Sequence, residues 1–202
     1  MSLCAIIPVK PLKRGKSRLS SVLSVEERTN LNKRMLINML TCLKDVTQID
    51  YFIVVSYDPS TLAIARDLGA KTVLENKITN LNRALRKATV AAKAFNATQV
   101  LILPADLPLI NKEDINKFIE HSGKPPEIVI SSDHRQNGTN ALLVNPIGAI
   151  DYDFGEWSFK KHIEQAERKK LRIDICDIED IKYDLDIPED LELLRLKGII
   201  LN

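Results

Sequence analysis

Residues Gln99–Pro108 read QVLILPADLP, a short apolar run that leads into a carboxylate held between two prolines. The apolar half is continuous and rich in β-forming residues, which is typical of a strand covered on both faces. Such a strand belongs in the middle of an α/β sheet, and Asp106 follows it at the position where these sheets bind ligands. Pro104 and Pro108 restrict the backbone, so we expect this carboxylate on a stiff turn. A role in capping the next helix is the alternative.

The rest of the chain alternates strand and helix patterns. Ser24 and Glu27 form a capping-box pattern before a long helix. Asp58 is placed to cap a helix that ends near Gly69, and Pro188 suits the first turn of the last helix. Further strands are predicted at residues 3–9, 51–56, 71–74, 128–130, 141–144 and 171–176. This alternation predicts an α/β protein with three layers, α/β/α, around a mostly parallel central sheet, in one domain that spans residues 1–202.

The composition is that of a globular domain with a sizeable core. Of the 202 residues, 45% are apolar and 28% are charged. The net charge of +2 and the aromatic content of 5% give no indication of a nucleic-acid-binding surface. No apolar run is long enough to span a membrane, and three scattered cysteines are typical of reduced residues. We therefore expect a cytoplasmic protein that binds neither nucleic acid nor membrane.

A basic loop follows the first predicted strand. Residues 10–19 read KPLKRGKSRL and hold five cations with a single glycine. Like charges repel, so a polyanion such as a triphosphate would relieve a repulsion that a solvated loop has no reason to concentrate. Gly15-Lys16-Ser17 resembles the end of a P-loop, but the complete GxxxxGK[ST] pattern is absent. Phosphate binding is the favoured interpretation, and a solvated basic loop is the alternative.

Two later segments offer smaller polar sites. In residues 133–140 (DHRQNGTN), Thr139 lies close to Arg135 and to backbone donors, as in an anion site, although a self-satisfied hairpin loop explains them equally well. Gly155 allows close approach of a ligand to the backbone, and Ser158 is placed to cap the helix that follows. His162 on that helix is expected to be exposed rather than catalytic.

A second acidic segment precedes the last helix. Asp184 and Asp186 alternate at strand spacing, so they should face opposite sides, and one of them should meet Asp106. Two carboxylates with open positions suit Mg²⁺, which keeps waters and also binds substrate phosphates. A basic phosphate loop with two such aspartates is the layout of nucleotidyl transfer.

Several segments together resemble a known family. The chain is similar to nucleotidyltransferases of the glycosyltransferase-A-like fold and, within them, resembles the 2-phospho-L-lactate guanylyltransferase family of coenzyme F-420 biosynthesis. The Gly138–Leu142 and Phe154–Phe159 segments point to this family, whereas the others are shared with many nucleotidyltransferases: residues 7–10 (IPVK), 16–19 (KSRL), 104–108 (PADLP) and 184–191 (DLDIPEDL). The resemblance implies a Rossmann-like nucleotide-diphospho-sugar transferase fold.

The resemblance also implies a reaction and a set of roles. GTP would condense with 2-phospho-L-lactate, or with phosphoenolpyruvate as in related members, to give a guanosine diphosphate conjugate and pyrophosphate. Residues 133–170 would bind the phosphorylated three-carbon acid or form a dimer contact. The implied site residues are Lys10, Lys16 and Arg18 for the triphosphate, with Lys16, Arg18 and Asp106 catalytic, Asp106 and Asp186 for Mg²⁺, Asn82 near the base, and Thr139, Gly155 and Ser158 for the acid.

Some observations leave alternatives open. From the residue alone, Asn82 is better placed to cap its helix than to read a base. The family usually has a glycine where this chain has Asn80, and sugar-nucleotide and molybdopterin relatives have a more glycine-rich first loop. The competing functions are another nucleotidyltransferase of this fold, with a sugar phosphate or pterin acceptor, and a non-catalytic nucleotide-binding regulator. A homodimer is suggested by apolar residues in the region 147–152 that have no evident core role.

Overall fold

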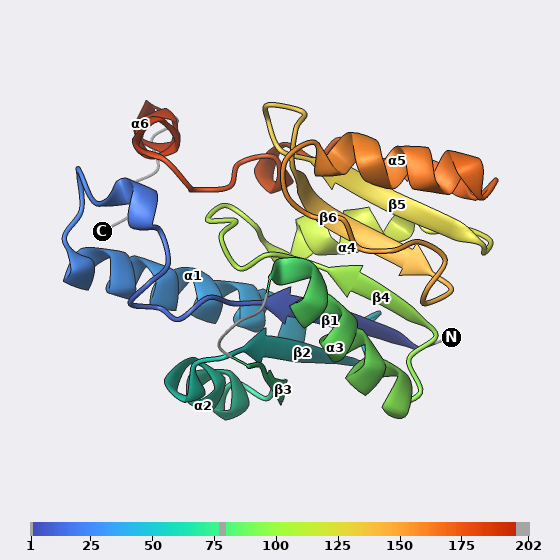
Figure 1. Cartoon of the computed structure of the whole chain (residues 1–202), viewed down its shortest axis with the longest axis horizontal. Helices are drawn as coiled ribbons and strands as arrows, with labels where there is room; N and C mark the ends of the chain where they lie inside the picture. Colours follow the sequence, from blue (N-terminus) through green and yellow to red (C-terminus); the bar gives the residue numbers. More distant parts are fainter. Residues whose placement is uncertain (1, 77–79, 197–202) are drawn as a thin grey trace.

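A seven-stranded sheet forms the middle layer of the computed structural model, which describes residues 2–76 and 80–196 (Figure 1). Its strand order is β3-β2-β1-β4-β6-β5-β7. Central β4 pairs in parallel with β1 and antiparallel with β6, and within the described ranges only β6 runs against the other strands. The prediction of a mostly parallel sheet centred on the 99–103 strand is confirmed. The strands are β1 (Leu3–Pro8), β2 (Tyr51–Ser56), β3 (Lys71–Leu74), β4 (Gln99–Ile102), β5 (Glu127–Ser132), β6 (Thr139–Asn145) and β7 (Arg172–Ile175).

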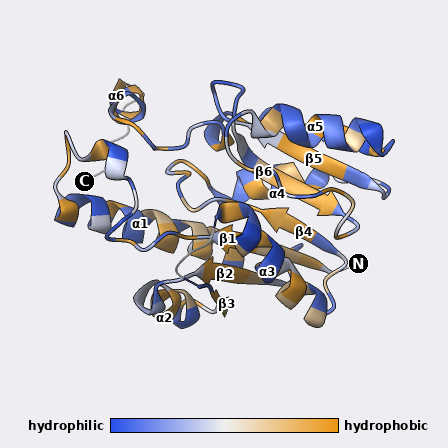
Figure 2. Cartoon of the chain, in the orientation of Figure 1, coloured by the Kyte–Doolittle hydropathy of each residue, from blue (hydrophilic) through white to orange (hydrophobic). Residues whose placement is uncertain are grey.

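Helices cover both faces of this sheet, so the predicted three layers are confirmed. In Figure 1, α3 (Leu81–Ala94) lies in front of the sheet and α4 (Lys112–Glu120) lies behind it. Along β1, Ala5 and Ile7 pack into the core beneath α1 (Val25–Lys44), α2 (Pro59–Asp67) and α4. Cys4 and Ile6 pack into the opposite core, beneath α3 and α5 (Ser158–Arg168). The middle of the sheet is accordingly mostly hydrophobic in Figure 2.

A third apolar cluster joins two segments that are far apart in the sequence. It connects the basic loop, through the short helix η1 (Ser17–Leu19), to the C-terminal helix α6 (Pro188–Leu196). Its fully buried members include Leu19 and Leu185, and both pack with residues of α1. The cluster therefore holds the basic loop beside the Asp184–Asp186 segment, and its buried members are Leu19, Leu31, Met35, Leu185, Leu191 and Leu194.

Local capping signals set most helix starts. The Ser24–Glu27 capping box, the Asp58 cap and the Asn111 cap of α4 are all formed. The capping role expected of Asn82 is wrong, because Asn80 is the residue in extended conformation and its side chain accepts from the Arg83 N–H at 2.9 Å. The same holds for Ser158, which is the first residue of α5 rather than its cap.

The apolar residues of the region 147–152 have a core role after all. Ile150 and Tyr152 are buried in the cluster beneath α3 and α5, and Ile147 packs against it. The Tyr152 hydroxyl also makes a buried hydrogen bond with the Thr89 hydroxyl at 2.7 Å. The apolar residues that suggested a dimer contact therefore belong to the interior, and a homodimer stays a prediction.

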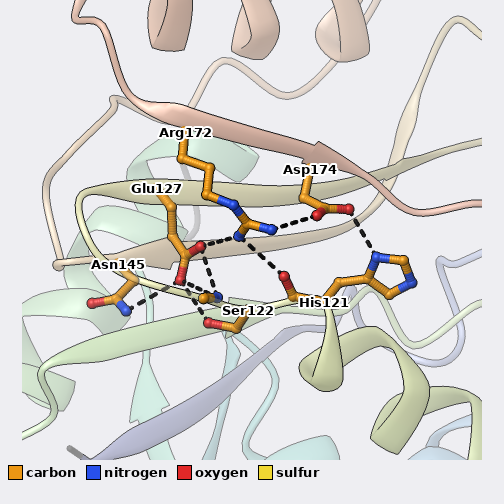
Figure 3. Close-up of polar contacts among 7 residues, drawn as sticks. His121, Ser122, Glu127, Asn145, Arg172 and Asp174 are labelled. Atoms are coloured by element: carbon orange, nitrogen blue, oxygen red, sulfur yellow. Dashed lines mark hydrogen bonds and ion pairs between the residues drawn. The ribbon is translucent and has the colours of Figure 1, made fainter.

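The buried carboxylate of Glu127 links β5 to β7 at the end of the sheet where these two strands begin. Glu127 of β5 accepts hydrogen bonds from the Ser122 hydroxyl and the Gly123 N–H, and it pairs with Arg172 of β7 (Figure 3). Arg172 also bonds Asp174, whose other oxygen contacts the His121 ring at 2.8 Å.

Within residues 2–76 and 80–196, no helix combines the length and apolarity needed to cross a bilayer.

Candidate active site

A cavity of about 730 Å³ opens at the carboxyl ends of the parallel strands. This volume is in the range of small-molecule sites, and its position follows the rule for open α/β sheets. Its floor combines the ends of β1, β2 and β4 with the start of β6, which enters from the opposite direction. Among the lining residues are Lys10, Lys16, Arg18, Asp106, Thr139, Gly155, Ser158 and Asp186, so the structure brings together eight of the nine residues that the sequence indicated.

The order of the strands determines which side chains line each part of the cavity. Tyr57 and Glu75 line it beyond the ends of β2 and β3, and the basic loop lines it after β1. Asp106 follows β4 in the middle, and Thr139 begins β6 on the far side. From the β3 side to the β6 side, the cavity is therefore lined first by Tyr57 and Glu75, then by the cations and aspartates, and last by hydroxyl groups.

The Lys16 ammonium stands between the two aspartates expected to hold a metal. Its Nζ donates to Asp106 Oδ2 at 2.6 Å and to Asp186 Oδ1 at 2.8 Å, and its side chain is only 6% exposed. The Lys16 backbone is left-handed, with φ of 56°. The neighbouring Gly15 lets the Asn32 side chain approach the loop, because a Cβ at residue 15 would lie 2.6 Å from the Asn32 side-chain nitrogen. Asn32, whose amide donates to the Leu12 carbonyl at 2.8 Å, thus packs against the loop next to Lys16.

The charges in this cluster perturb one another. Burial works to lower the pKa of Lys16, but the attraction of Asp106 and Asp186 overcomes it and raises the pKa above its ordinary value. Burial works to raise the pKa of Asp186, and Lys16, with Lys10 and Arg18 further away, outweighs it and lowers that pKa. Burial, together with the charges of Asp106 and Asp186, raises the pKa of Asp184 to about 6. The ammonium therefore neutralises a crowded group of carboxylates.

The expectation that Asp184 and Asp186 face opposite sides is wrong. At strand spacing, residues two positions apart share a face, and Leu185 between them is buried in the apolar cluster with Leu19. The Leu185 N–H also bonds the Asp106 carbonyl, which holds the segment next to Asp106. Asp184 lies beside Asn140, whose amide donates to it at 3.4 Å. Both carboxylates consequently lie on the same side as Asp106.

The carboxylates provide a suitable place for a hard divalent cation. Two aspartate oxygens already converge on one positive group, and an oxygen-only donor set with few protein ligands suits Mg²⁺. No group of three potential metal-binding side chains occurs within residues 2–76 and 80–196. A metal here would keep positions for water and phosphate oxygens, as Mg²⁺ usually does in proteins.

A second set of contacts holds the Asp186 segment. Asp190, in the first turn of α6, accepts from the backbone N–H groups of Asp186 and Ile187 at 2.8 and 2.9 Å. Its other oxygen bonds Arg135 from the β5–β6 loop at 2.5 Å. Arg135, which the sequence suggested for an anion site, is therefore engaged by α6.

The far end of the cavity holds a pair of hydroxyls. Thr139 Oγ1 and Ser158 Oγ lie 3.1 Å apart, and both residues are buried. Gly155 has φ of 128°, a conformation that L side chains rarely adopt, and no atom would meet a Cβ there within 4 Å. The expected exposure of His162 is wrong: the ring is fully buried and its Nδ1 lies 3.1 Å from Thr139 Oγ1. The helix turns this residue inward because it shares a face with buried Ala166.

Asn82 is the indicated residue that the structure places elsewhere. Its amide donates to the Phe154 carbonyl at 3.1 Å, and its oxygen accepts from the Phe154 N–H at 2.7 Å. It lines a neighbouring, more open cavity between α3 and α5, whereas Asn80 and Leu81 line the main cavity. Asn82 thereby fixes the loop that carries Gly155.

Sequence reasoning missed several supporting residues. Asp190 had a signal, because a carboxylate at the third helical position is the partner that a capping box expects. Asn137 accepts from the Trp157 N–H at 2.6 Å and Asn140 donates to the Ile181 carbonyl at 2.9 Å. These two contacts join segments distant in sequence, so no local pattern could have revealed them.

Comparisons with known proteins show which proteins the chain is similar to. The chain matches the family model described as "Guanylyl transferase CofC like" over residues 3–199. It is 40% identical over 198 residues to phosphoenolpyruvate guanylyltransferase of Rubrobacter xylanophilus, covering 98% of this chain and 96% of that one. It is 38% identical over 193 residues to 2-phospho-L-lactate guanylyltransferase of Methanobrevibacter smithii, covering 96% and 84%. A nucleotidyl transferase structure from Methanothermobacter thermautotrophicus shares the fold, with a TM-score of 0.69, 12% identity and 97% of each chain covered.

Proposed function

The chain belongs to the CofC-like guanylyl transferase family, and on that premise we propose that it transfers the GMP unit of GTP to a phosphorylated three-carbon acid, with release of pyrophosphate. The acid is 2-phospho-L-lactate or phosphoenolpyruvate, as in the names of its relatives. The product would serve coenzyme F-420 biosynthesis, as the family resemblance implies. Residues 133–170 would carry the acid-binding part of the single domain.

The observation that carries this proposal is the order of groups along the cavity. Lys10, Lys16 and Arg18 offer cations to a triphosphate, and Asp106 and Asp186 lie next to them. The Thr139–Ser158 hydroxyl pair and Gly155 lie on the other side of the carboxylates, where a small phosphorylated acid would be seated. A nucleotide and an acid bound in this order would meet at the α-phosphate.

The base would then lie beyond β2 and β3. Glu75 lines the cavity there, and its Oε1 is enclosed with no hydrogen-bond partner in the described parts of the chain. Burial raises the pKa of Glu75, an effect that Lys87 and Arg83 partly oppose. A buried acceptor without a donor is costly, and the N1–H and 2-amino groups of guanine are donors of the matching kind. We assign Glu75, rather than Asn82, to recognition of the guanine edge.

The chemical step needs no general base. An oxygen of the acid's phosphate attacks the α-phosphorus, a new P–O bond forms, and the bond to the bridging oxygen of the β-phosphate breaks, so pyrophosphate leaves with that electron pair. The attacking phosphate is already anionic at neutral pH. Both nitrogens of His162, the histidine at this end of the cavity, are engaged within the protein. Catalysis would therefore come from positioning and charge neutralisation.

Mg²⁺ fits this scheme as the cofactor. Asp106 and Asp186 would hold it, and when bound it would neutralise negative charge on the phosphates of GTP. Lys16 would then be released from the two carboxylates and would contact the triphosphate with Lys10 and Arg18.

The proposal is tested by pyrophosphate release in the presence of Mg²⁺. GTP, ATP, CTP and UTP are each paired with 2-phospho-L-lactate, phosphoenolpyruvate, 3-phosphoglycerate and a hexose 1-phosphate. We expect turnover with GTP and one three-carbon acid, and its loss by at least 100-fold in Asp106→Asn. Turnover only with the hexose phosphate would support another nucleotidyltransferase of this fold. Nucleotide binding that needs no Mg²⁺ and yields no pyrophosphate would support a regulator instead.

A further inference from the structure

His162 is a buried polar residue that the proposed chemistry does not use directly. It is fully enclosed, and the Phe154 ring packs edge-on against it with centroids 4.9 Å apart. The Asp153 backbone N–H lies 3.1 Å from Nε2, and Thr139 Oγ1 lies 3.1 Å from Nδ1. Both ring nitrogens are therefore used, and the ring is held in one orientation.

These two contacts define the tautomer of His162. A backbone N–H can only donate, so Nε2 must be the unprotonated, accepting nitrogen. Burial, with a smaller opposing effect of Asp153, lowers the pKa of His162 to about 4, so the ring is neutral at physiological pH. A neutral ring that accepts at Nε2 carries its proton on Nδ1. Nδ1–H therefore donates to Thr139 Oγ1.

The direction of that bond determines what the hydroxyl pair offers to the cavity. The chain His162–Thr139–Ser158 has two internal hydrogen bonds and three protons, namely Nδ1–H and the two hydroxyl protons. Whichever hydroxyl donates across the 3.1 Å Thr139–Ser158 contact, one hydroxyl proton remains for a ligand. With the opposite tautomer, Nδ1 would accept from Thr139, both hydroxyl protons would be used internally, and only lone pairs would face the cavity.

We propose that His162 is a positioning residue that makes the Thr139–Ser158 pair a hydrogen-bond donor toward an anionic oxygen of the phosphorylated acid. The inference rests on the proposed function, because it takes the acid to be bound at this end of the cavity. Phosphate and carboxylate oxygens are acceptors at neutral pH, so a pair that offered only lone pairs would repel them. His162 thereby contributes to selection of the acid without touching it.

The first test is the tautomer itself, measured by NMR on protein labelled with ¹⁵N-histidine. We expect one histidine with a protonated Nδ1 and an unprotonated Nε2, and its signal should be absent in His162→Asn. A protonated Nε2 at this residue would overturn the proposal whatever the kinetics are.

The second test separates the two Michaelis constants. In His162→Leu, KM for the three-carbon acid should rise about tenfold or more while KM for GTP changes less than twofold. His162→Asn keeps a donor beside Thr139, so its KM for the acid should stay within about threefold of the wild-type value. Tyr152→Phe is the matched control. It removes another buried hydroxyl, the one that bonds Thr89, and it should change neither KM.

Each result bears on one claim. A folded His162→Leu with unchanged KM for the acid, or an equal rise in Tyr152→Phe, would contradict the role of His162 while the wild type remains an active transferase. If His162→Leu does not fold, the wild-type tautomer and the KM of His162→Asn for the acid decide whether His162 has this role. Absence of turnover in the wild type with every phospho-acid would instead contradict the proposed function.

Discussion

Lys16 is the residue on which the charge balance of the site depends. Its ammonium is shared by Asp106 and Asp186 and occupies the position between them. A divalent cation that binds these carboxylates must compete with it. Lys16 would therefore act first as an internal counter-ion and then, after Mg²⁺ binds, as a ligand of the triphosphate.

This dual role predicts opposite effects in Lys16→Met. In the absence of nucleotide, Mn²⁺ should bind more tightly than to the wild type, because no ammonium competes for the aspartates. The turnover number should nevertheless fall by roughly 10²- to 10³-fold, the usual loss when a charge-stabilising donor is removed. Mn²⁺ affinity is measured by electron paramagnetic resonance.

Lys13→Met is the matched control for this variant. Lys13 is exposed in the same loop, and it is not among the residues that line the cavity. It should change neither Mn²⁺ affinity nor turnover by more than about twofold, as for most surface substitutions. Weaker Mn²⁺ binding in Lys16→Met than in the wild type would show that the lysine does not act as a competing counter-ion.

Glu75 gives a prediction about base selection. The wild type should prefer GTP to inosine triphosphate, which lacks the 2-amino group, by about tenfold or more, since a good polar contact to a base contributes about 1–3 kcal/mol. Glu75→Met should bring this ratio of kcat/KM close to one. Glu156→Met, at the other end of the cavity, should preserve it. Equal ratios in the wild type and Glu75→Met would remove Glu75 from base recognition.

At this scale the sequence predicted residue types better than contacts. The basic loop and Asp106 were recognisable because their charges are concentrated next to strands. The insertion of Lys16 between two aspartates 90 and 170 residues away depends on tertiary packing that local patterns do not encode. The burial of His162 had a local signal, because it lies one helical turn before buried Ala166.

At the scale of elements, α6 and the β5–β6 loop together hold the segment that contains Asp186. Asp190 in α6 binds the Asp186 and Ile187 backbone, and Arg135 from the loop binds Asp190. The loop that begins at Asp133 and ends at Thr139 is thus joined to the segment that carries Asp186. A displacement of the loop would therefore also displace the segment that carries Asp186.

Removal of this link should weaken metal use without unfolding the protein. Arg135→Met is expected to raise the Mg²⁺ concentration needed for half-maximal activity about three- to tenfold, a coupling of about 1 kcal/mol that is usual for such networks. Asp190→Asn alone should do the same, and the double variant should be no worse than the more affected single variant. Strictly additive effects in this double-mutant cycle would contradict the link.

The Glu127 network gives a prediction about stability at the opposite end of the sheet. Glu127 is enclosed and Arg172 is partly exposed, so Glu127→Gln should cost about 2 kcal/mol of unfolding free energy rather than the larger cost of a fully buried pair. Burial works to raise the pKa of Glu127, but its bonds from Ser122, Gly123 and Arg172 lower it below the ordinary value.

The sign of this pKa change sets the pH dependence. A carboxyl with a lowered folded-state pKa stabilises the fold above its ordinary pKa, and the contribution is lost as pH falls through the lowered value. The difference in unfolding free energy between wild type and Glu127→Gln should therefore be constant at neutral pH and shrink in acid. Urea titrations across pH measure it, and a difference that grows in acid would contradict the assignment.

Elements were the part of the structure that the sequence predicted best. The strands at 51–56 and 71–74 and the helix starts after Ser24 and Asp58 follow from apolar periodicity and capping, which are local. The facing of Asp184 and Asp186 was predicted wrongly although it is a local property, because residues two apart at strand spacing share a face. Their position beside Asp106 depends on the bond from the Leu185 N–H to the Asp106 carbonyl, far away in sequence.

At the scale of the whole molecule, the order of the strands sets the order in which the two proposed substrates would lie along the cavity. The edge strand β3 and its neighbour β2 flank the place assigned to the base. The loops after β1 and β4 carry the cations and the carboxylate, and β6 begins with Thr139 of the hydroxyl pair and runs in the opposite direction. The antiparallel entry of β6 brings the start of a strand, rather than its end, to the catalytic edge. In the proposed reaction the acid would therefore approach the α-phosphate of GTP from the side opposite the base.

The central claim, that this cavity joins GTP to a phosphorylated three-carbon acid, is tested most directly by ³¹P NMR of the reaction products. With Mg²⁺, GTP and either 2-phospho-L-lactate or phosphoenolpyruvate, we expect a pair of coupled diphosphate resonances that appear together with pyrophosphate in equal amounts. Intact GTP, or hydrolysis of GTP without a coupled diphosphate, with both acids would contradict it.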